Sequence, residues 1–149
     1  MNLVATKHVS IEKVEHFLQQ NRDVNGNALM QHGYVVEIEQ QIEGCFILEP
    51  MEPGVYWLKQ LHVTKKCAPS LAVLLESVLA IAKQRHAKSV YVHSHQPVVD
   101  LLLDALQFHP QKKNEFVDSQ QMKEGNWWVY NVSKMSYSQD RVDNTNISC

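Results

Sequence analysis

The stretch that most constrains this chain is residues 61–75, LHVTKKCAPSLAVLL. Its first residues end an apolar run of strand type, and from Leu71 onward the apolar residues recur at the spacing of a helix. A strand, a short loop and a helix are therefore predicted. The first N–H groups of a helix have no partners within it and carry the positive end of its dipole, so this junction suits an anionic ligand. The loop, however, contains no glycine, and Pro69 in its middle has no N–H to donate.

Composition narrows the class of protein. The 149 residues are most simply one domain, and 44% hydrophobic with 20% charged residues is ordinary for a globular protein. A formal net charge of −2 gives no electrostatic basis for binding nucleic acid or an anionic membrane. The N-terminus lacks an apolar run of signal-peptide length, and no segment approaches the roughly 20 apolar residues of a membrane span.

The cysteines, Cys45, Cys67 and Cys149, are scattered and odd in number. This pattern indicates neither a disulfide framework nor a zinc cluster. We therefore expect no metal site and a cytoplasmic location.

Apolar periodicity predicts seven strands and three helices. The strands are expected at residues 3–7, 34–39, 45–49, 55–63, 89–93, 115–118 and 127–134, with a hairpin connection at 40–44 and a further turn from Pro50 to Gly54. The helices are expected from Ser10 as N-cap to about residue 20, from residue 71, and from Pro97, the last with Val98, Leu101, Leu102, Ala105 and Leu106 as its buried stripe. Residues 21–27 are expected to form a polar turn. Of the adjacent Trp127 and Trp128, one is expected in the core and its neighbour at a cleft or contact surface.

This order and several of its segments resemble the GNAT superfamily of acetyl-CoA-dependent N-acetyltransferases. The hairpin VVEIEQQIEGCFILEP resembles the family's second and third strands, and WLKQLHV resembles the fourth, with the L-x-V signature at Leu61 and Val63. LLESVLAIAKQRHAKSVYV resembles the third helix and fifth strand, and VVDLLLDALQF the fourth helix, ending at Phe108.

The resemblance covers nearly the whole chain and implies an α/β fold. The expected architecture is a mixed, mostly antiparallel sheet of six to seven strands flanked by helices. It includes a splayed central pair formed by strands 55–63 and 89–93. Residues 1–135 are expected to be a single GNAT-like domain, and residues 136–149 a polar, flexible tail.

In this family a Q/R-x-x-G-x-G/A loop wraps the pyrophosphate of the cofactor, and residues 66–71, KCAPSL, align with it. Lys66 keeps the charge of an arginine without its bidentate fork, Pro69 replaces a glycine, and Leu71 adds bulk. One lost hydrogen bond to a charged group costs about 1.5–3 kcal/mol, which weakens a site without abolishing it. The resemblance implies acetyl-CoA, or coenzyme A, as co-substrate, with contacts at Leu61, His62, Val63, Lys66, Cys67, Ala68, Ser70, Leu71, Ala72 and His95.

The catalytic groups are less well matched. The family's tyrosine acid aligns with Leu103, which has no proton to donate, and the positions of its usual base align near Trp57 and Lys59. Candidates for a base are Glu49, or Glu52, acting through water, and His93 or His95 at the end of a strand. The alternative for the histidines is a polar strand end without a catalytic role. Cys67 lies beside two lysines near a helix N-terminus, surroundings that predict a lowered thiol pKa.

Two functions follow from the resemblance. One is an acyltransferase that moves an acetyl or other acyl group from coenzyme A to the amine of a small molecule or protein. The other is a non-catalytic GNAT-shaped binding or regulatory module. The architecture favours the enzyme, whereas Pro69, Leu71 and Leu103 favour the module. We expect no nucleic-acid or membrane partner, and the resemblance implies a homodimer.

Overall fold

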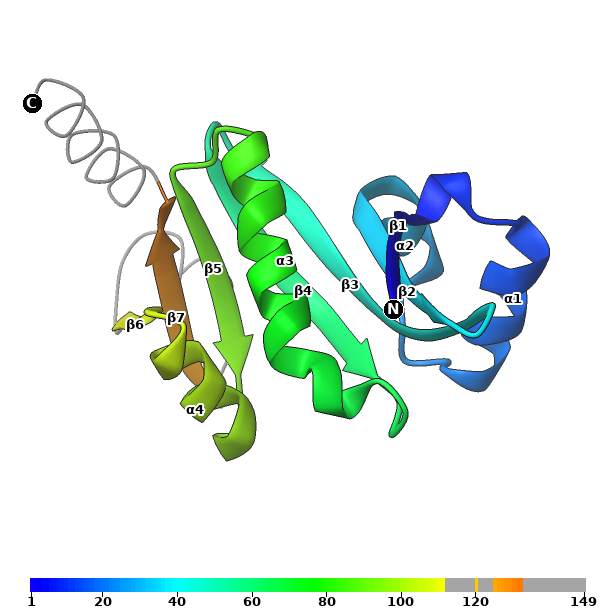
Figure 1. The fold of residues 1–149 in the computed structure, drawn as a ribbon. Coiled ribbons are helices and arrows are strands. Elements are labelled where there is room, and N and C mark those ends of the chain that lie inside the picture. The colour runs from blue at the N-terminus through cyan, green and yellow to red at the C-terminus, as the bar shows by residue number, and fades with distance from the viewer. Residues whose placement is uncertain (112–119, 121–124, 133–149) are drawn as a thin grey trace, which may run out of the picture. The chain divides into compact units, whose positions relative to one another are not determined.

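The computed structural model describes residues 1–111, 120 and 125–132 (Figure 1). Its elements are β1 (Asn2–Ala5), the 3₁₀ turn η1 (Thr6–His8), α1 (Ile11–Gln20), α2 (Gly26–His32), β2 (Gly33–Ile38), β3 (Gln41–Glu52), β4 (Val55–Val63), the 3₁₀ turn η2 (Ala68–Ser70), α3 (Leu71–Gln84), β5 (Ser89–Ser94), α4 (Pro97–Ala105), β6 (His109–Gln111) and β7 (Asn126–Asn131). The strand predicted at 115–118 and the tail predicted at 136–149 lie outside the described residues. Within the described residues, no helix is long and apolar enough to cross a membrane.

The strands form one seven-stranded sheet in the order β1-β2-β3-β4-β5-β7-β6. Pairing is antiparallel between β1 and β2, β2 and β3, β5 and β7, and β6 and β7. The predicted fold class, a mixed and mostly antiparallel sheet with flanking helices, is confirmed.

Contacts between residues divide the chain into two compact units, each discontinuous in sequence. The first comprises Met1–Glu49 and Leu58–Leu74, and the second Pro50–Trp57 and the described residues from Leu75 onward. The prediction of a single domain ending at residue 135 stays a prediction.

The core of the first unit lies between its two helices and strands β2 and β3. Helix α1 contributes Val14 and Phe17, which are 0% and 3% exposed. They pack with Leu29 of α2 and with Val35 and Ile47 of the strands. Because Val14 and Phe17 are three residues apart, they share one face of α1, whereas Ile11 at the start of the helix is 53% exposed.

Helix α2 was not expected from the sequence. Its segment opens with Asn25-Gly26-Asn27, a sequence typical of a turn, but Asn25 is a helix N-cap whose side chain accepts a hydrogen bond from the N–H of Ala28 at 3.1 Å. At its other end Gly33 is needed for close packing, because a Cβ there would lie 2.3 Å from the carbonyl oxygen of Leu29.

The β2–β3 hairpin is also tighter than expected. Its turn consists of Glu39 and Gln40, with φ of 53° and 69°. Two central residues of positive φ fit a two-residue hairpin of the primed type, in which glycine and asparagine are usual. The connection predicted at residues 40–44 is therefore wrong, since β3 already begins at Gln41. It also continues through Pro50 to Glu52, past the point where the sequence predicted its end.

In the second unit, the buried side of α4 differs from the predicted stripe. Leu103 is 0% exposed, whereas Val98 and Leu101 are 67% and 73% exposed. The end of the helix explains the choice: the N–H of Phe108 donates to the carbonyl oxygen of Leu103 at 2.9 Å, and Phe108 is itself buried. Leu103 and Phe108 thus hold the two positions of a Schellman cap at which apolar residues are usual.

Candidate functional site

The loop between β4 and α3 lies within the first unit, where the sequence placed the pyrophosphate-binding segment. Its backbone N–H groups are bonded within the loop. Those of Cys67 and Ala68 both donate to the carbonyl oxygen of Thr64, at 3.1 and 2.8 Å. The N–H of Ser70 donates to Cys67 at 2.8 Å, and that of Leu71 to Ala68. With Pro69 lacking an N–H, none of the amides from 67 to 71 is available to an anion in this conformation.

The cation of the loop is also paired. The ammonium of Lys66 lies 2.6 Å from Oε2 of Glu39 in the β2–β3 turn. The hydrogen bond from Lys66 lowers the pKa of Glu39, and the same bond raises the pKa of Lys66. Both side chains are exposed, so the pair is open to exchange with ions from solvent.

Cys67 is buried beneath the loop rather than displayed on it. Its residue is 0% exposed, and burial, with a smaller effect of the Glu43 carboxylate, raises the pKa of its thiol. The prediction of a lowered pKa is therefore wrong, because the desolvation of the thiol outweighs the neighbouring lysines. Its sulfur lies 3.3 Å from where a Cβ on Gly44 would be, so glycine at 44 lets β3 approach the loop closely.

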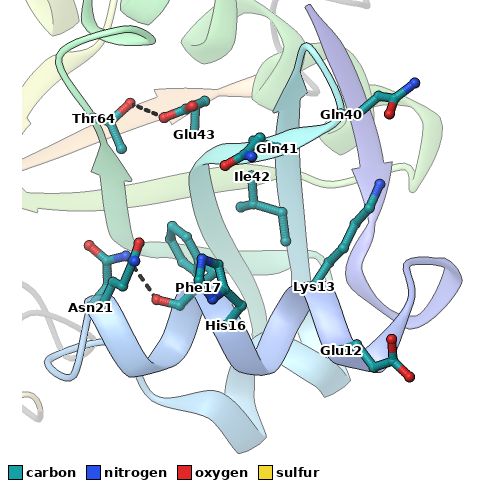
Figure 2. Close-up of a pocket in the computed structure, with 11 residues that line it drawn as sticks. Glu12, Lys13, His16, Phe17, Asn21, Gln40, Gln41, Ile42, Glu43 and Thr64 are labelled. Carbon is teal, nitrogen blue, oxygen red and sulfur yellow. Dashed lines mark hydrogen bonds between the residues drawn. The ribbon is translucent and has the colours of Figure 1, made fainter.

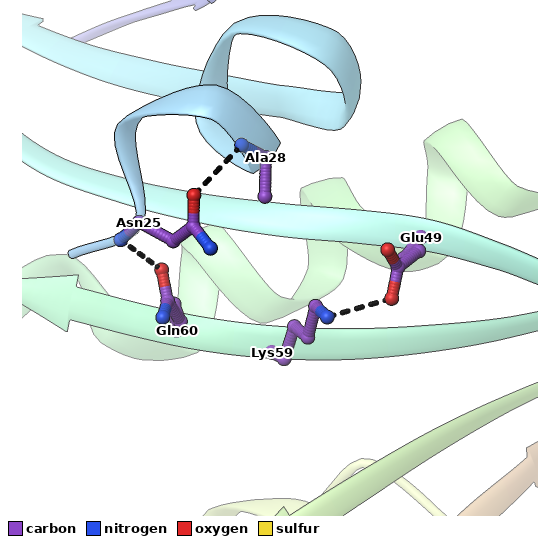
Figure 3. Close-up of polar contacts among 5 residues, drawn as sticks. All are labelled: Asn25, Ala28, Glu49, Lys59 and Gln60. Atoms are coloured by element: carbon purple, nitrogen blue, oxygen red, sulfur yellow. Dashed lines mark hydrogen bonds and ion pairs between the residues drawn. The ribbon is translucent and has the colours of Figure 1, made fainter.

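Strand β4 is irregular four residues before the loop. Gln60 has a φ of 53°, a left-handed conformation that is uncommon for a non-glycine residue. Its side-chain Oε1 accepts a hydrogen bond from the N–H of Asn25 at 2.7 Å, which ties β4 to the start of α2 (Figure 3). Two residues further along β4, His62 faces α1. Its ring lies edge-on to that of Phe17, with the ring centroids 6.0 Å apart.

The candidate bases are placed as follows. Glu49, near the end of β3, pairs with Lys59 of β4 at 2.6 Å (Figure 3), so its carboxylate is already engaged by a cation. His93 and His95 belong to the second unit. His93 is half-buried against Trp127, with ring centroids 5.1 Å apart, and His95 is exposed in the segment between β5 and α4. A catalytic role for any of the three stays a prediction.

The predicted cofactor residues divide between the units. Leu61, His62, Val63 and the loop positions up to Ala72 form one continuous segment of the first unit, whereas His95 belongs to the second. Leu103, at the position of the family's acid, is fully buried, and its carbonyl oxygen accepts the N–H of Phe108 at the end of α4. It therefore presents no group to a ligand.

A cavity of about 370 Å³ adjoins the loop within the first unit (Figure 2). It lies between α1 and the start of β3, and Thr64 at the head of the loop forms part of its wall. The hydroxyl of Thr64 donates to Oε1 of Glu43 at 2.8 Å. Its lining is made of Glu12, Lys13, His16, Phe17, Gln20, Asn21, Gln40, Gln41, Ile42, Glu43 and Thr64. These residues come from three segments of the chain that no motif connects, so the sequence carries no sign of this site.

No model of a known protein family matches the sequence, and no curated protein matches it significantly. The fold, by contrast, is shared with solved structures. A GNAT-family acetyltransferase from Staphylococcus aureus Mu50 superposes with a TM-score of 0.66 at 15% identity, over 88% of this chain and 98% of that one. Tetrahymena GCN5 superposes with a TM-score of 0.60 at 10% identity, over 88% of this chain and 94% of that one.

A longer relative in structure is N-acetylglutamate synthase from Neisseria gonorrhoeae, solved with coenzyme A and N-acetyl-glutamate. It superposes with a TM-score of 0.67 at 12% identity, over 88% of this chain and 35% of that one. The chain therefore has the fold of the GNAT N-acetyltransferases.

Proposed function

We propose that the protein is an acyl-CoA-dependent N-acyltransferase with a weakened cofactor loop, which transfers an acetyl or other acyl group to an amine. The observation that carries this proposal is the match of 88% of the chain to GNAT acetyltransferases, including a synthase crystallised with coenzyme A. The strand–loop–helix junction at residues 63–71 lies at the position where the sequence aligned the family's pyrophosphate loop.

In the described conformation the loop must rearrange before it can bind a diphosphate. The free energies of the hydrogen bonds involved indicate how much this rearrangement costs. The Lys66–Glu39 pair is exposed and screened by solvent, so a diphosphate can replace Glu39 at small cost. Each hydrogen bond within the loop is worth about 0.5–1.5 kcal/mol, against about 1.5–3 kcal/mol for one to a charged group. Exchanging a hydrogen bond within the loop for one to a phosphate oxygen is therefore favourable at each amide that can turn outward. Pro69 has no N–H and cannot contribute such a bond.

The test is calorimetric titration of the protein with acetyl-CoA and with free coenzyme A at modest salt. Binding in the micromolar to submillimolar range supports the proposal and justifies a screen of amine acceptors, with the acylated product measured by mass spectrometry. Absence of heat up to millimolar ligand, together with an unchanged melting temperature, would sink it.

The second candidate is a GNAT-shaped binding or regulatory module without transferase activity. The specific observations in its favour are the loop amides bonded within the loop and the burial of Leu103 where the family places an acid. Under this function, no acylated product forms with any amine, whether or not coenzyme A binds. The screen of amine acceptors, with product measured by mass spectrometry, therefore separates the two candidates.

A further inference from the structure

The cavity beside α1 has the size and the lining of a site for a small polar molecule. Its volume of about 370 Å³ falls within the range of ligand pockets, which is about 300–1,000 Å³. Phe17, nearly buried, and Ile42, half-buried, supply an apolar surface. Around them stand four carboxamide side chains, which both donate and accept hydrogen bonds: Gln20, Asn21, Gln40 and Gln41.

The charge of the lining is negative. With His16 counted as neutral, Glu12 and Glu43 contribute two carboxylates, and the single lysine, Lys13, already pairs with Glu37 at 3.1 Å. Such a lining disfavours the phosphates of a nucleotide or of coenzyme A and favours a cation. Lys66, outside the lining, also acts on Glu43 through its charge, but its ammonium is bonded to Glu39.

Glu43 is the best-placed anion for a bound ligand. Its Oε1 accepts the Thr64 hydroxyl at 2.8 Å, which fixes the orientation of the carboxylate against the cavity wall (Figure 2). A carboxylate has about four lone-pair sites, so Glu43 retains acceptor capacity toward a ligand ammonium. Nearby, the Nδ2 group of Asn21 donates to the carbonyl oxygen of Phe17 at 2.9 Å, which leaves its side-chain oxygen as an acceptor.

We propose that this cavity binds a small primary amine, held as an ammonium by Glu43 and flanked by hydroxyl or carbonyl groups that bond to the carboxamides. The site follows from the cavity alone and does not require acyl transfer. If the proposed acyltransferase function holds, this is the amine-bearing class from which its acceptors should be screened first.

The experiment uses the full chain without coenzyme A. Glucosamine and serinamide are titrated into ¹⁵N-labelled protein, and each is compared with its N-acetyl form, which has the same skeleton but no cation. We expect both amines to shift the amide signals of Ile42, Glu43 and Thr64, and to bind at least fivefold more tightly than their N-acetyl forms. Equal binding of amine and N-acetyl compound, or shifts confined to other residues, would overturn the proposal.

Two variants sharpen the test. Glu43→Gln keeps the shape and a hydrogen-bond acceptor for Thr64 but removes the charge, so we expect amine affinity to fall about tenfold. Glu15→Gln makes the same chemical change on α1, at a residue outside the cavity lining, and should leave affinity unchanged. Thermal melts confirm that both variants fold, and unchanged amine affinity in a folded Glu43→Gln protein refutes the site. Because coenzyme A is absent throughout, failure here is distinct from failure of the acetyl-CoA titration.

Discussion

Lys66 and Glu39 join two loops that are far apart in sequence: the ammonium of one lies 2.6 Å from the carboxylate of the other. Glu39 sits in the two-residue β2–β3 turn with a φ of 53°, and Lys66 sits in the loop that leads into α3. The loop that resembles a pyrophosphate site thus has its cation neutralised by the protein's own carboxylate. Any phosphate that binds Lys66 must therefore compete with the carboxylate of Glu39.

Removing this competitor should strengthen the binding of coenzyme A. In Glu39→Gln the ammonium of Lys66 loses its anionic partner, and we expect affinity for coenzyme A to rise by up to about fivefold at low salt, the equivalent of an exposed ion pair. The measurement is calorimetric titration. Glu37→Gln is the matched control, because Glu37 lies on the same hairpin, pairs with Lys13 of α1, and its substitution changes net charge equally. Similar gains in both variants would mean that only the overall charge matters.

Restoring the family's glycines should act on the loop backbone. Pro69→Gly supplies an N–H donor and Leu71→Gly removes bulk, so the double variant should bind coenzyme A about tenfold more tightly. Pro53→Gly, in an exposed turn outside the loop, serves as the control for added backbone freedom. If affinity is the same in the double variant and the natural protein, the loop makes no contact with a diphosphate.

Helix α4 should gain stability from a glycine at its cap. Gln107 has a φ of 72°, and its N–H donates to the carbonyl oxygen of Asp104 at 3.1 Å, as the residue after a Schellman-capped helix does. Gln107→Gly removes the steric cost of this conformation and should raise the free energy of unfolding by about 0.5–1 kcal/mol.

The matched substitution Gln19→Gly lies within α1, where φ is helical, and should lower stability by about 1 kcal/mol. Both are measured by urea denaturation followed by circular dichroism. A loss of stability in Gln107→Gly would show that its side chain contributes more than its backbone costs.

The buried thiols should be unreactive and should make stability depend on alkaline pH. Burial, with a smaller effect of Asp23, raises the pKa of Cys45 from an ordinary 9.0 to about 12. In the unfolded chain this thiol ionises above pH 9, whereas in the folded chain it stays protonated. Its contribution is therefore intact below pH 9 and is lost as pH rises toward 12, by up to about 1.4 kcal/mol per pH unit.

Denaturation between pH 8 and 10.5 measures this slope, and Cys45→Ala should be less stable at pH 8 but show a shallower decline. Alkylation followed by peptide mass analysis provides the second readout: Cys45 and Cys67 should react only after denaturation. Labelling of Cys67 in the folded protein at neutral pH would contradict its burial.

The sequence predicted the centre of the fold better than its first third. The bounds of β4 and the first residue of α3 agree with the structure, because a strand apolar on both faces gives way to helical spacing at Leu71. Helix α2 was missed because Asn25-Gly26-Asn27 has the composition of a turn. Asparagine is equally common as a helix N-cap, which is the role that Asn25 has here. The Glu39-Gln40 turn carries no glycine or asparagine to mark it.

The sequence could not predict the contacts of the candidate site that join residues far apart in the chain. The loop was located from its own residues, but its partners Glu39 and Glu43 lie 27 and 21 residues away from Lys66 and Thr64, and no local pattern connects them. The sequence predicted one of Trp127 and Trp128 in the core and its neighbour at a cleft or contact surface, whereas both are buried, at 6% and 8% exposure. Trp128 reaches Asp100 of α4, to which its indole N–H donates at 3.0 Å.

The division of the chain into two interleaved units has a consequence for its synthesis. The first unit lacks residues 58–74 until they leave the ribosome, and the intervening segment, residues 50–57, belongs to the second unit. The core between the helices and strands β2 and β3 can form without them, but the edge of β3 has no neighbour until β4 is made. At about 5–20 residues per second, that edge stays unpaired for roughly one to three seconds. A nascent chain that stalls between residues 49 and 63 would therefore present an open strand edge, which is a template for pairing with another chain.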